Sequence, residues 1–126
     1  MESSNDPRIL LVDDNKINQR LAKLIFNQIG FKCDIASNGQ EAFEMYRLKF
    51  YDVIFMDLQM PVLDGLESSK LIRAFEKESE SVHRVTIVAL SGSEQEEKKE
   101  TCLECGMDDF IEKPIRLDWL NQFFRK

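Results

Sequence analysis

The stretch Val53-Ile54-Phe55-Met56-Asp57 decides the fold of this chain. Four apolar residues in succession, with β-branched and aromatic members, are typical of a strand that is buried on both faces. The run ends in a carboxylate, and turn residues follow it as far as Gly65. In an open parallel sheet, this position faces the crevice at the carboxyl ends of the strands, where such folds bind ligands. Asp57 is therefore a candidate functional residue.

Four other segments have the composition of strands. Residues 8–12 and 85–90 are mainly apolar runs, and residues 33–36 and 109–114 contain shorter ones. Helical patterns separate them, because apolar residues recur every three or four positions. Five strands that alternate with five helices predict an α/β fold: one doubly wound, five-stranded parallel sheet with helices on both faces, joined by right-handed crossovers.

The predicted helices have recognisable starts and stops. Asn38 and Asp64 are expected to cap two helices, and Ser93 with Glu96 has the pattern of a capping box. Gly30 and Gly106 are expected to end helices. Apolar residues also mark the faces of the first and last helices: Ile17, Leu21, Leu24, Ile25 and Ile29 in the first, and Leu117, Leu120, Phe123 and Phe124, with Trp119 beside them, in the last.

Composition narrows the class of protein. The chain has 126 residues, which suits one domain, and we expect residues 1–7 to form a flexible arm before a domain of residues 8–126. A net charge of −6 and the lack of a basic stripe argue against a nucleic-acid partner. No apolar run is long enough to span a membrane, so we expect no membrane contact by this segment and a cytoplasmic location, within a parent protein that can be membrane-anchored.

Three cysteines cannot pair completely, which indicates a reducing compartment. Cys102 and Cys105 have the spacing of a redox or zinc half-site. They fall near the end of a predicted helix, however, and the single histidine, His83, supplies too little to complete a zinc site. We therefore favour structural packing for these cysteines, and redox or metal binding stays as the alternative.

Polar side chains gather at the ends of the predicted strands: Asp13, Asp14, Asp57, Ser91 and Lys113. The carboxyl ends of parallel strands share one edge, so three carboxylates would meet there and repel one another. A divalent cation offsets this repulsion, and Mg²⁺ is usually held by one or two carboxylates while it keeps several waters. A lysine and a hydroxyl suit phosphoryl oxygens. The set predicts metal-assisted phosphoryl chemistry.

Each of these residues also has an ordinary structural interpretation. Asp13 or Asp14 alone could cap the helix that follows. Ser91 alone could be a loop hydroxyl, and Lys113 alone a solvated charge. Their joint placement at four strand ends is what favours a functional site.

These residues resemble the receiver domain of two-component response regulators, a CheY-like family with a flavodoxin-like fold. The likeness runs from about Arg8 to Phe124 and is greatest to receivers of hybrid sensor histidine kinases. The stretches that carry it are Leu11-Val12-Asp13-Asp14-Asn15 with Asn18, Met56-Asp57-Leu58-Gln59-Met60-Pro61 with Asp64-Gly65, and residues 106–115 around Lys113-Pro114.

The resemblance implies a mechanism. Asp57 is expected to take a phosphoryl group from phosphohistidine and to become an aspartyl phosphate. Asp14, Asp57 and the backbone carbonyl of Gln59 are expected to ligate Mg²⁺, for which Mn²⁺ can substitute, and Asp13 is expected to act through a metal-bound water. Such a chain phosphorylates and dephosphorylates itself and is no stand-alone metabolic enzyme, although its parent can be a histidine kinase.

The resemblance also implies a switch. Ser91 and Lys113 are expected to contact phosphoryl oxygens, and Phe110 stands where the family has an aromatic switch residue. When Ser91 moves inward, Phe110 can fill the vacated space, which alters the surface of the fourth helix, last strand and last helix. The implied partners are a histidine kinase as phosphodonor and a histidine phosphotransfer protein that accepts the phosphoryl group.

Other functions remain to be weighed. A phosphatase of the aspartate-nucleophile class needs a second acid two residues after Asp57, and that position is Gln59. A flavin module of this architecture needs a phosphate-binding loop after the first strand, where this chain has acidic residues. The alternative that stays open is a receiver-like protein-interaction module that is not phosphorylated.

Overall fold

A computed structural model describes residues 6–58, 63–80, 83–91, 96–113 and 115–125, with only the backbone for 96–99 and 125. The predicted cap at Ser93 and most of the predicted arm lie outside these residues. In chain order the elements are β1 (Ile9–Val12), α1 (Lys16–Gln28), β2 (Cys33–Ala36), α2 (Gly39–Leu48), β3 (Val53–Asp57), α3 (Gly65–Glu78), β4 (Thr86–Ser91), α4 (Glu96–Glu104), β5 (Asp109–Glu112) and α5 (Leu117–Arg125).

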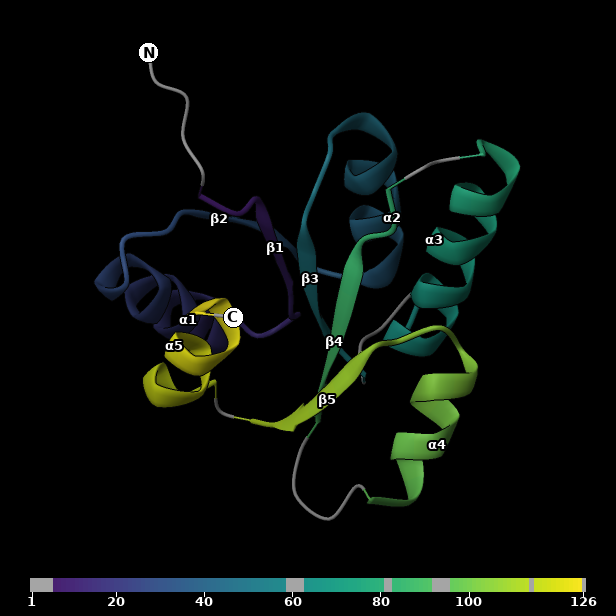
Figure 1. Ribbon diagram of the computed structural model, residues 1–126. Helices are drawn as coiled ribbons and strands as arrows, with labels where there is room; N and C mark the ends of the chain where they lie inside the picture. The colour runs from purple at the N-terminus through teal and green to yellow at the C-terminus, as the bar shows by residue number, and fades with distance from the viewer. Residues whose placement is uncertain (1–5, 59–62, 81–82, 92–95, 114, 126) are drawn as a thin grey trace.

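Within the described residues the strands form one parallel sheet in the order β2-β1-β3-β4-β5. Helices α1 and α5 cover one face of the sheet, and α2, α3 and α4 cover the other (Figure 1). The predicted doubly wound α/β fold is therefore confirmed.

The inner strands are mainly apolar because alternate side chains enter two different cores. In β3, Ile54 and Met56 pack under α2 and α3, whereas Val53 and Phe55 pack under α1 and α5. All five residues of β3 are buried. A strand that serves two cores cannot alternate with polar residues, which is why the continuous run is a reliable signal.

Four of the predicted helix ends are confirmed. The side chains of Asn38 and Asp64 accept hydrogen bonds from the backbone N–H groups three residues later. Glu41, three residues after Asn38, also supports this helix start, because its carboxylate accepts a hydrogen bond from the N–H of Ser37. Gly30 and Gly106 follow helix ends with φ of +87° and +101°, a region that favours glycine.

The first helix packs with only part of the apolar set that its spacing marked, because Ile25 and Ile29 pack against the core and the other three residues are exposed. Ala22 and Phe26 are its buried residues, whereas Ile17, Leu21 and Leu24 are 69%, 49% and 61% exposed. Helix α1 thus has two apolar sides, and only one of them faces the sheet. The aromatic side of α5 does turn inward: Trp119, Phe123 and Phe124 are partly buried and contact the ring of Phe55.

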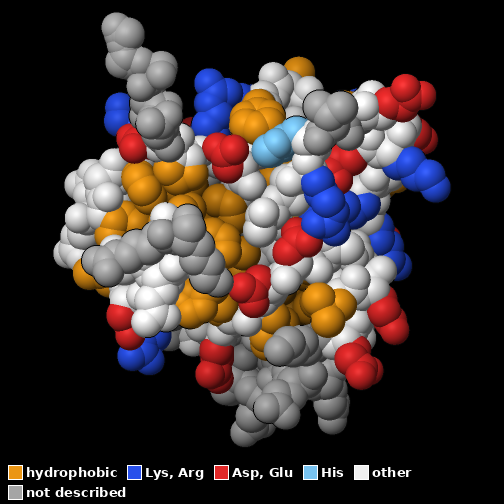
Figure 2. Space-filling view, viewed as in Figure 1, with side chains coloured by type: hydrophobic (Ala, Val, Ile, Leu, Met, Phe, Trp, Pro, Cys, Tyr) orange, Lys and Arg blue, Asp and Glu red, His pale blue; other side chains and the backbone are white. Residues whose placement is uncertain are grey.

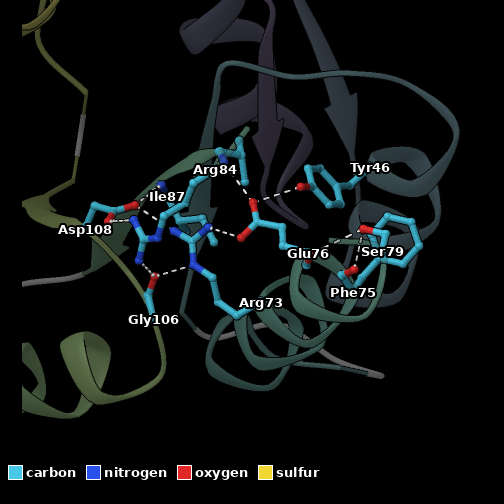
Figure 3. A network of polar contacts seen from close by, with 10 residues as sticks. Tyr46, Arg73, Phe75, Glu76, Ser79, Arg84, Ile87, Gly106 and Asp108 are labelled. Atoms are coloured by element: carbon cyan, nitrogen blue, oxygen red, sulfur yellow. Dashed lines mark hydrogen bonds and ion pairs between the residues drawn. The ribbon is translucent and has the colours of Figure 1, made fainter. Parts of the chain in front are cut away.

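The last turn of α3 contains a buried acid. Glu76, 8% exposed, lies inside α3, and its carboxylate accepts hydrogen bonds from the Tyr46 hydroxyl at 2.9 Å and the Val85 N–H at 2.8 Å. Arg73 joins this carboxylate to Asp108 with contacts of 2.8 and 2.7 Å (Figure 3). These contacts satisfy a charge that would otherwise be costly to bury.

The cysteines behave as packing residues. All three are free thiols in the described part of the chain, and Cys102 and Cys105 are buried at the end of α4. Burial raises the pKa of the Cys33 thiol to about 11 and raises that of Cys105 as well. Neutral thiols are poor nucleophiles and poor metal ligands, which supports the structural interpretation.

Candidate functional site

The parallel register brings the strand ends together at one edge of the sheet. Val12 is paired with Met56, so Asp13 and Asp57 follow side by side on β1 and β3. Asp57 is paired with Leu90 on β4, and Ser91 with Glu112 on β5. Residues that are far apart in the sequence therefore converge because each one ends its strand or follows it directly.

The carboxylates of Asp13, Asp14 and Asp57 each offer an oxygen, and these oxygens lie within 4.8 Å of one another. Asp13 and Asp57 are buried, whereas Asp14 is exposed. Three anionic groups at this separation repel in a medium of reduced dielectric constant. An all-oxygen set with an exposed member suits a hard cation that keeps part of its water shell, such as Mg²⁺ or Mn²⁺.

Asp13 is fixed by its own loop. Its carboxylate Oδ1 accepts a hydrogen bond of 2.9 Å from the N–H of Asn15, and its N–H donates to the carbonyl of Ala36 at 3.1 Å. Asn15 also caps α1, because its side chain accepts from the N–H of Asn18. The helix therefore begins with Asn15 as its cap and leaves both aspartates for other roles.

Lys113, which directly follows β5, reaches the carboxylate of Asp57. Its Nζ lies 3.2 Å from Oδ2 of Asp57, and its backbone N–H donates to the carbonyl of Ser91 at 2.7 Å. The lysine is partly buried, with 28% of its side chain exposed, so water screens this charge pair less than it would at the surface. A cation and an acceptor carboxylate thus lie in direct contact.

Ser91 and Phe110 occupy neighbouring strands near this centre. Ser91 is buried at the end of β4, and Phe110 lies in β5, where it packs against the core under α2 and α3. Gln59, the remaining residue of the predicted site, lies outside the described residues. The structure therefore brings together Asp13, Asp14, Asp57 and Lys113, with Ser91 at the same sheet edge.

Two supporting contacts were missed in the sequence. A Cβ atom on Gly65 would lie 2.3 Å from the carbonyl oxygen of Asp57, so only glycine lets α3 begin this close to the acceptor residue. The amide Nε2 of Gln19 donates to the carbonyl of Asp13 at 2.6 Å. The Asp-Gly turn gave a hint of the first, whereas a glutamine in a first helical turn carries no such signal.

A cavity of about 500 Å³ opens beside the site, with a mainly apolar lining that includes Leu21 and Ile25 of α1. Asp13 and Lys113 are among its lining residues. It therefore connects the charged centre with the exposed apolar side of α1.

The only histidine of the chain lies away from these residues. His83 precedes β4, at the amino end of a strand whose carboxyl end carries Ser91. Its ring contacts that of Phe50 at a centroid distance of 4.1 Å, and Figure 2 shows it in pale blue at this edge of the molecule. A histidine held here cannot serve as an internal phosphodonor to Asp57.

The described part of the chain contains no helix that is long and apolar enough to cross a membrane.

Comparison with known proteins gives relatives that carry such a domain within longer chains. Hybrid signal transduction histidine kinase F of Dictyostelium discoideum is 46% identical over 120 residues, which cover 95% of this chain and 11% of that protein. Histidine kinase 5 of Arabidopsis thaliana is 38% identical over 144 residues, 97% of this chain and 16% of that protein. The chain thus spans a small part of these curated relatives.

Solved structures give the same result. The receiver domain of the Saccharomyces cerevisiae response regulator Ssk1, crystallised with the histidine phosphotransfer protein Ypd1, has a TM-score of 0.86 at 36% identity, over 95% of this chain and 88% of that one. The receiver domain of the Pseudomonas aeruginosa sensor histidine kinase PA1611, with magnesium in its active-site cleft, has a TM-score of 0.82 at 32% identity, over 95% of each chain.

A family match spans nearly all the described elements. Residues 9–125 match the response regulator receiver domain. Together with the sheet order and the site at its carboxyl edge, this shows that the chain belongs to the response regulator receiver domain family.

Proposed function

We propose that this chain is the phosphoacceptor of a histidine-to-aspartate phosphorelay, with Asp57 as the residue that is phosphorylated. One observation carries the proposal: a buried carboxylate lies within 4.8 Å of two other carboxylates and 3.2 Å from a lysine ammonium. Repulsion between the three acids destabilises the fold, and an inactive domain would have no functional reason to keep it. The arrangement suits the transfer of a charged phosphoryl group, which depends on positioning and on neutralisation of charge.

In the transfer, one carboxylate oxygen of Asp57 attacks the phosphorus of a phosphohistidine. A P–O bond forms, the P–N bond breaks, and its electron pair returns to the imidazole. Lys113, already in contact with Asp57, would pair with a phosphoryl oxygen, and Ser91 would donate its hydroxyl to another. Asp14, Asp57 and the Gln59 carbonyl would hold Mg²⁺ or Mn²⁺, with Asp13 acting through water, and the cation would neutralise the charge that gathers on the phosphoryl oxygens.

The same charges suggest how phosphorylation changes the domain. Once the phosphoryl group is attached, Lys113 and Ser91 gain a new partner and are drawn toward it. Phe110, two positions before Glu112 on the neighbouring strand, would move inward as Ser91 moves. We expect the surface of α4, β5 and α5 to be the one that changes.

The exposed side of α1 is a suitable docking surface for the phosphodonor. We define the α1 ridge as Ile17, Leu21 and Leu24, which are about half to two-thirds exposed. Leu21 also lines the cavity that reaches Asp13 and Lys113, so a protein on this ridge covers the approach to Asp57. A histidine kinase would donate the phosphoryl group here, and a histidine phosphotransfer protein, as in the Ypd1 complex of the yeast relative, would receive it.

Membership of a longer hybrid kinase and a cytoplasmic location are parts of this proposal. The relatives carry the domain within much longer kinases, and free, partly buried thiols suit a reducing compartment. The domain would act on no metabolite, and any self-dephosphorylation would be hydrolysis of its own acyl phosphate.

The test is intact mass after incubation with acetyl phosphate. We expect a labile gain of one phosphoryl group that requires Mg²⁺ and is lost in Asp57→Asn. Asp118→Asn, which removes an exposed carboxylate on α5, is the matched control and should be phosphorylated normally. Labelling of Asp57→Asn would refute the assignment. No labelling of the wild type, with no binding of beryllofluoride, would instead favour an interaction module that is not phosphorylated.

A further inference from the structure

The carboxylate of Asp14 has little direct support. It is the exposed member of the acidic cluster, and no described residue donates a hydrogen bond to it. Its position therefore depends on the backbone that carries it. A flexible carboxylate loses conformational entropy when it binds a cation, whereas one on a fixed backbone loses less.

That backbone is held on both sides of Asp14. The N–H of Asn15 donates to the Asp13 carboxylate at 2.9 Å, which closes the turn after Asp14. The carbonyl of Asp13 accepts a hydrogen bond of 2.6 Å from Nε2 of Gln19. Because the peptide group is planar, a fixed carbonyl of Asp13 also fixes the N–H and the Cα of Asp14.

The chemistry of this contact leaves one orientation for the glutamine amide. A carbonyl oxygen only accepts, so the group that faces it must be the NH₂ and not the amide oxygen. Gln19 lies in the first turn of α1, one turn after the cap residue Asn15, and is partly buried. Its other contact, to the Oγ of Ser37, is 3.4 Å long and therefore much weaker.

We infer that Gln19 is a positioning residue for the metal site, which sets the Asp13–Asp14 peptide so that the Asp14 carboxylate points at the cation. This inference rests on the proposed function, since it concerns the same cation. Gln19 does not contact the reacting atoms. It acts through Asp14, so it should govern how much Mg²⁺ is needed and leave the rate at saturating Mg²⁺ unchanged.

The experiment compares Gln19→Met with Gln28→Met. Methionine keeps the length of the side chain and removes its donor, and Gln28 is an exposed glutamine at the other end of the same helix. The Mg²⁺ dissociation constant is measured by titration of backbone amide NMR signals, and the half-saturating Mg²⁺ for phosphorylation by acetyl phosphate is measured beside it. We expect both to rise about threefold to tenfold in Gln19→Met, the equivalent of one hydrogen bond, and to stay unchanged in Gln28→Met.

A second substitution separates the two contacts of Gln19. Ser37→Ala removes the acceptor at 3.4 Å and keeps the one at 2.6 Å, so it should leave Mg²⁺ affinity unchanged. A lower Tm in Gln19→Met with unchanged Mg²⁺ affinity would show a purely structural role and would overturn the inference, as would equal effects of all three substitutions.

A further NMR measurement uses only the wild-type protein, so its result does not depend on whether a variant folds. The side-chain NH₂ signals of Gln19 should show one proton shifted downfield by its hydrogen bond, and they should move when Mg²⁺ is added. Two NH₂ signals at the positions of an exposed glutamine, neither of which moves with Mg²⁺, would refute the inference. Failure of the wild type to bind Mg²⁺ or to be phosphorylated would refute the proposed function itself, so the two failures are distinguishable.

Discussion

Replacement of Asp57 by asparagine should stabilise the domain when no divalent cation is present. The substitution keeps the size of the side chain and removes one of three charges that lie within 4.8 Å of one another. The fold itself should be unaffected, because Asp57 ends β3 and its backbone contacts are kept.

The structure gives the size of the effect. With an effective dielectric constant of about 20, two carboxylates at the 4.8 Å limit of this cluster repel by about 3.5 kcal/mol, and a lysine 3.2 Å away attracts by about 5 kcal/mol. These two repulsions and this one attraction together leave a net cost of about 2 kcal/mol at Asp57. Exposure of Asp14 and Lys113 screens both contributions, while the amide oxygen of the variant still accepts from Lys113. We therefore expect a gain of about 1 kcal/mol, or a Tm rise of about 4 °C.

The assay is thermal unfolding in EDTA and then in Mg²⁺. In EDTA the variant should unfold at the higher temperature, and the difference should shrink in 1 M salt, where the Debye length is about 3 Å. In Mg²⁺ the wild type should gain more stability than the variant, because it binds the cation more tightly. Asp118→Asn is again the control and should behave as the wild type. A variant that is equally stable or less stable in EDTA would refute the claim that the acidic cluster is strained.

Three further results are expected. Leu21→Ser should slow phosphotransfer from a phosphohistidine protein about tenfold, the effect of losing an interface anchor, and should leave labelling by acetyl phosphate unchanged. The control is Leu103→Ser, at an exposed leucine of α4. Equal effects of the two substitutions would rule out docking on the α1 ridge. Tyr46→Phe removes a donor from the buried carboxylate of Glu76 and should cost about 1–3 kcal/mol in urea unfolding; an unchanged midpoint would contradict this. Burial raises the pKa of Cys33 from 9.0 to about 11, so as pH rises the thiol loses its proton first in the unfolded state. The contribution of Cys33 to the free energy of unfolding should therefore fall between pH 9 and 11. Cys33→Ala should remove that part of the pH dependence.

The pattern of the sequence was sufficient to predict the order of strands and helices along the chain and the parallel pairing of the strands. A continuous apolar run such as residues 53–56 occurs where both faces of a strand are buried, and helices between such runs leave few topologies other than a parallel doubly wound sheet. Caps at Asn38 and Asp64 are local interactions within four residues, so they too can be read from the sequence. The acidic set followed from the same topology, since residues that end parallel strands share an edge.

Other features depend on contacts between segments far apart in the chain. Helical spacing marked the apolar residues of α1 but could not tell the side that packs, around Phe26, from the side that stays exposed, around Leu21. Nothing in the sequence near Glu76 marks it as buried, because the groups that satisfy its carboxylate belong to Tyr46 and Val85, 30 and 9 residues away. Gln19 is likewise an ordinary surface residue by type, and its role follows from a distance of 2.6 Å.

The division has one physical cause. Periodicity, caps and strand-end residues depend on residues that lie close together in the sequence. The side of a helix that is buried, the partner of a buried charge and the direction of an exposed carboxylate depend on how finished elements pack. In this domain the local pattern was enough to predict the sheet and its acidic edge, whereas packing selected the α1 ridge, the Glu76 contacts and the support of Asp14.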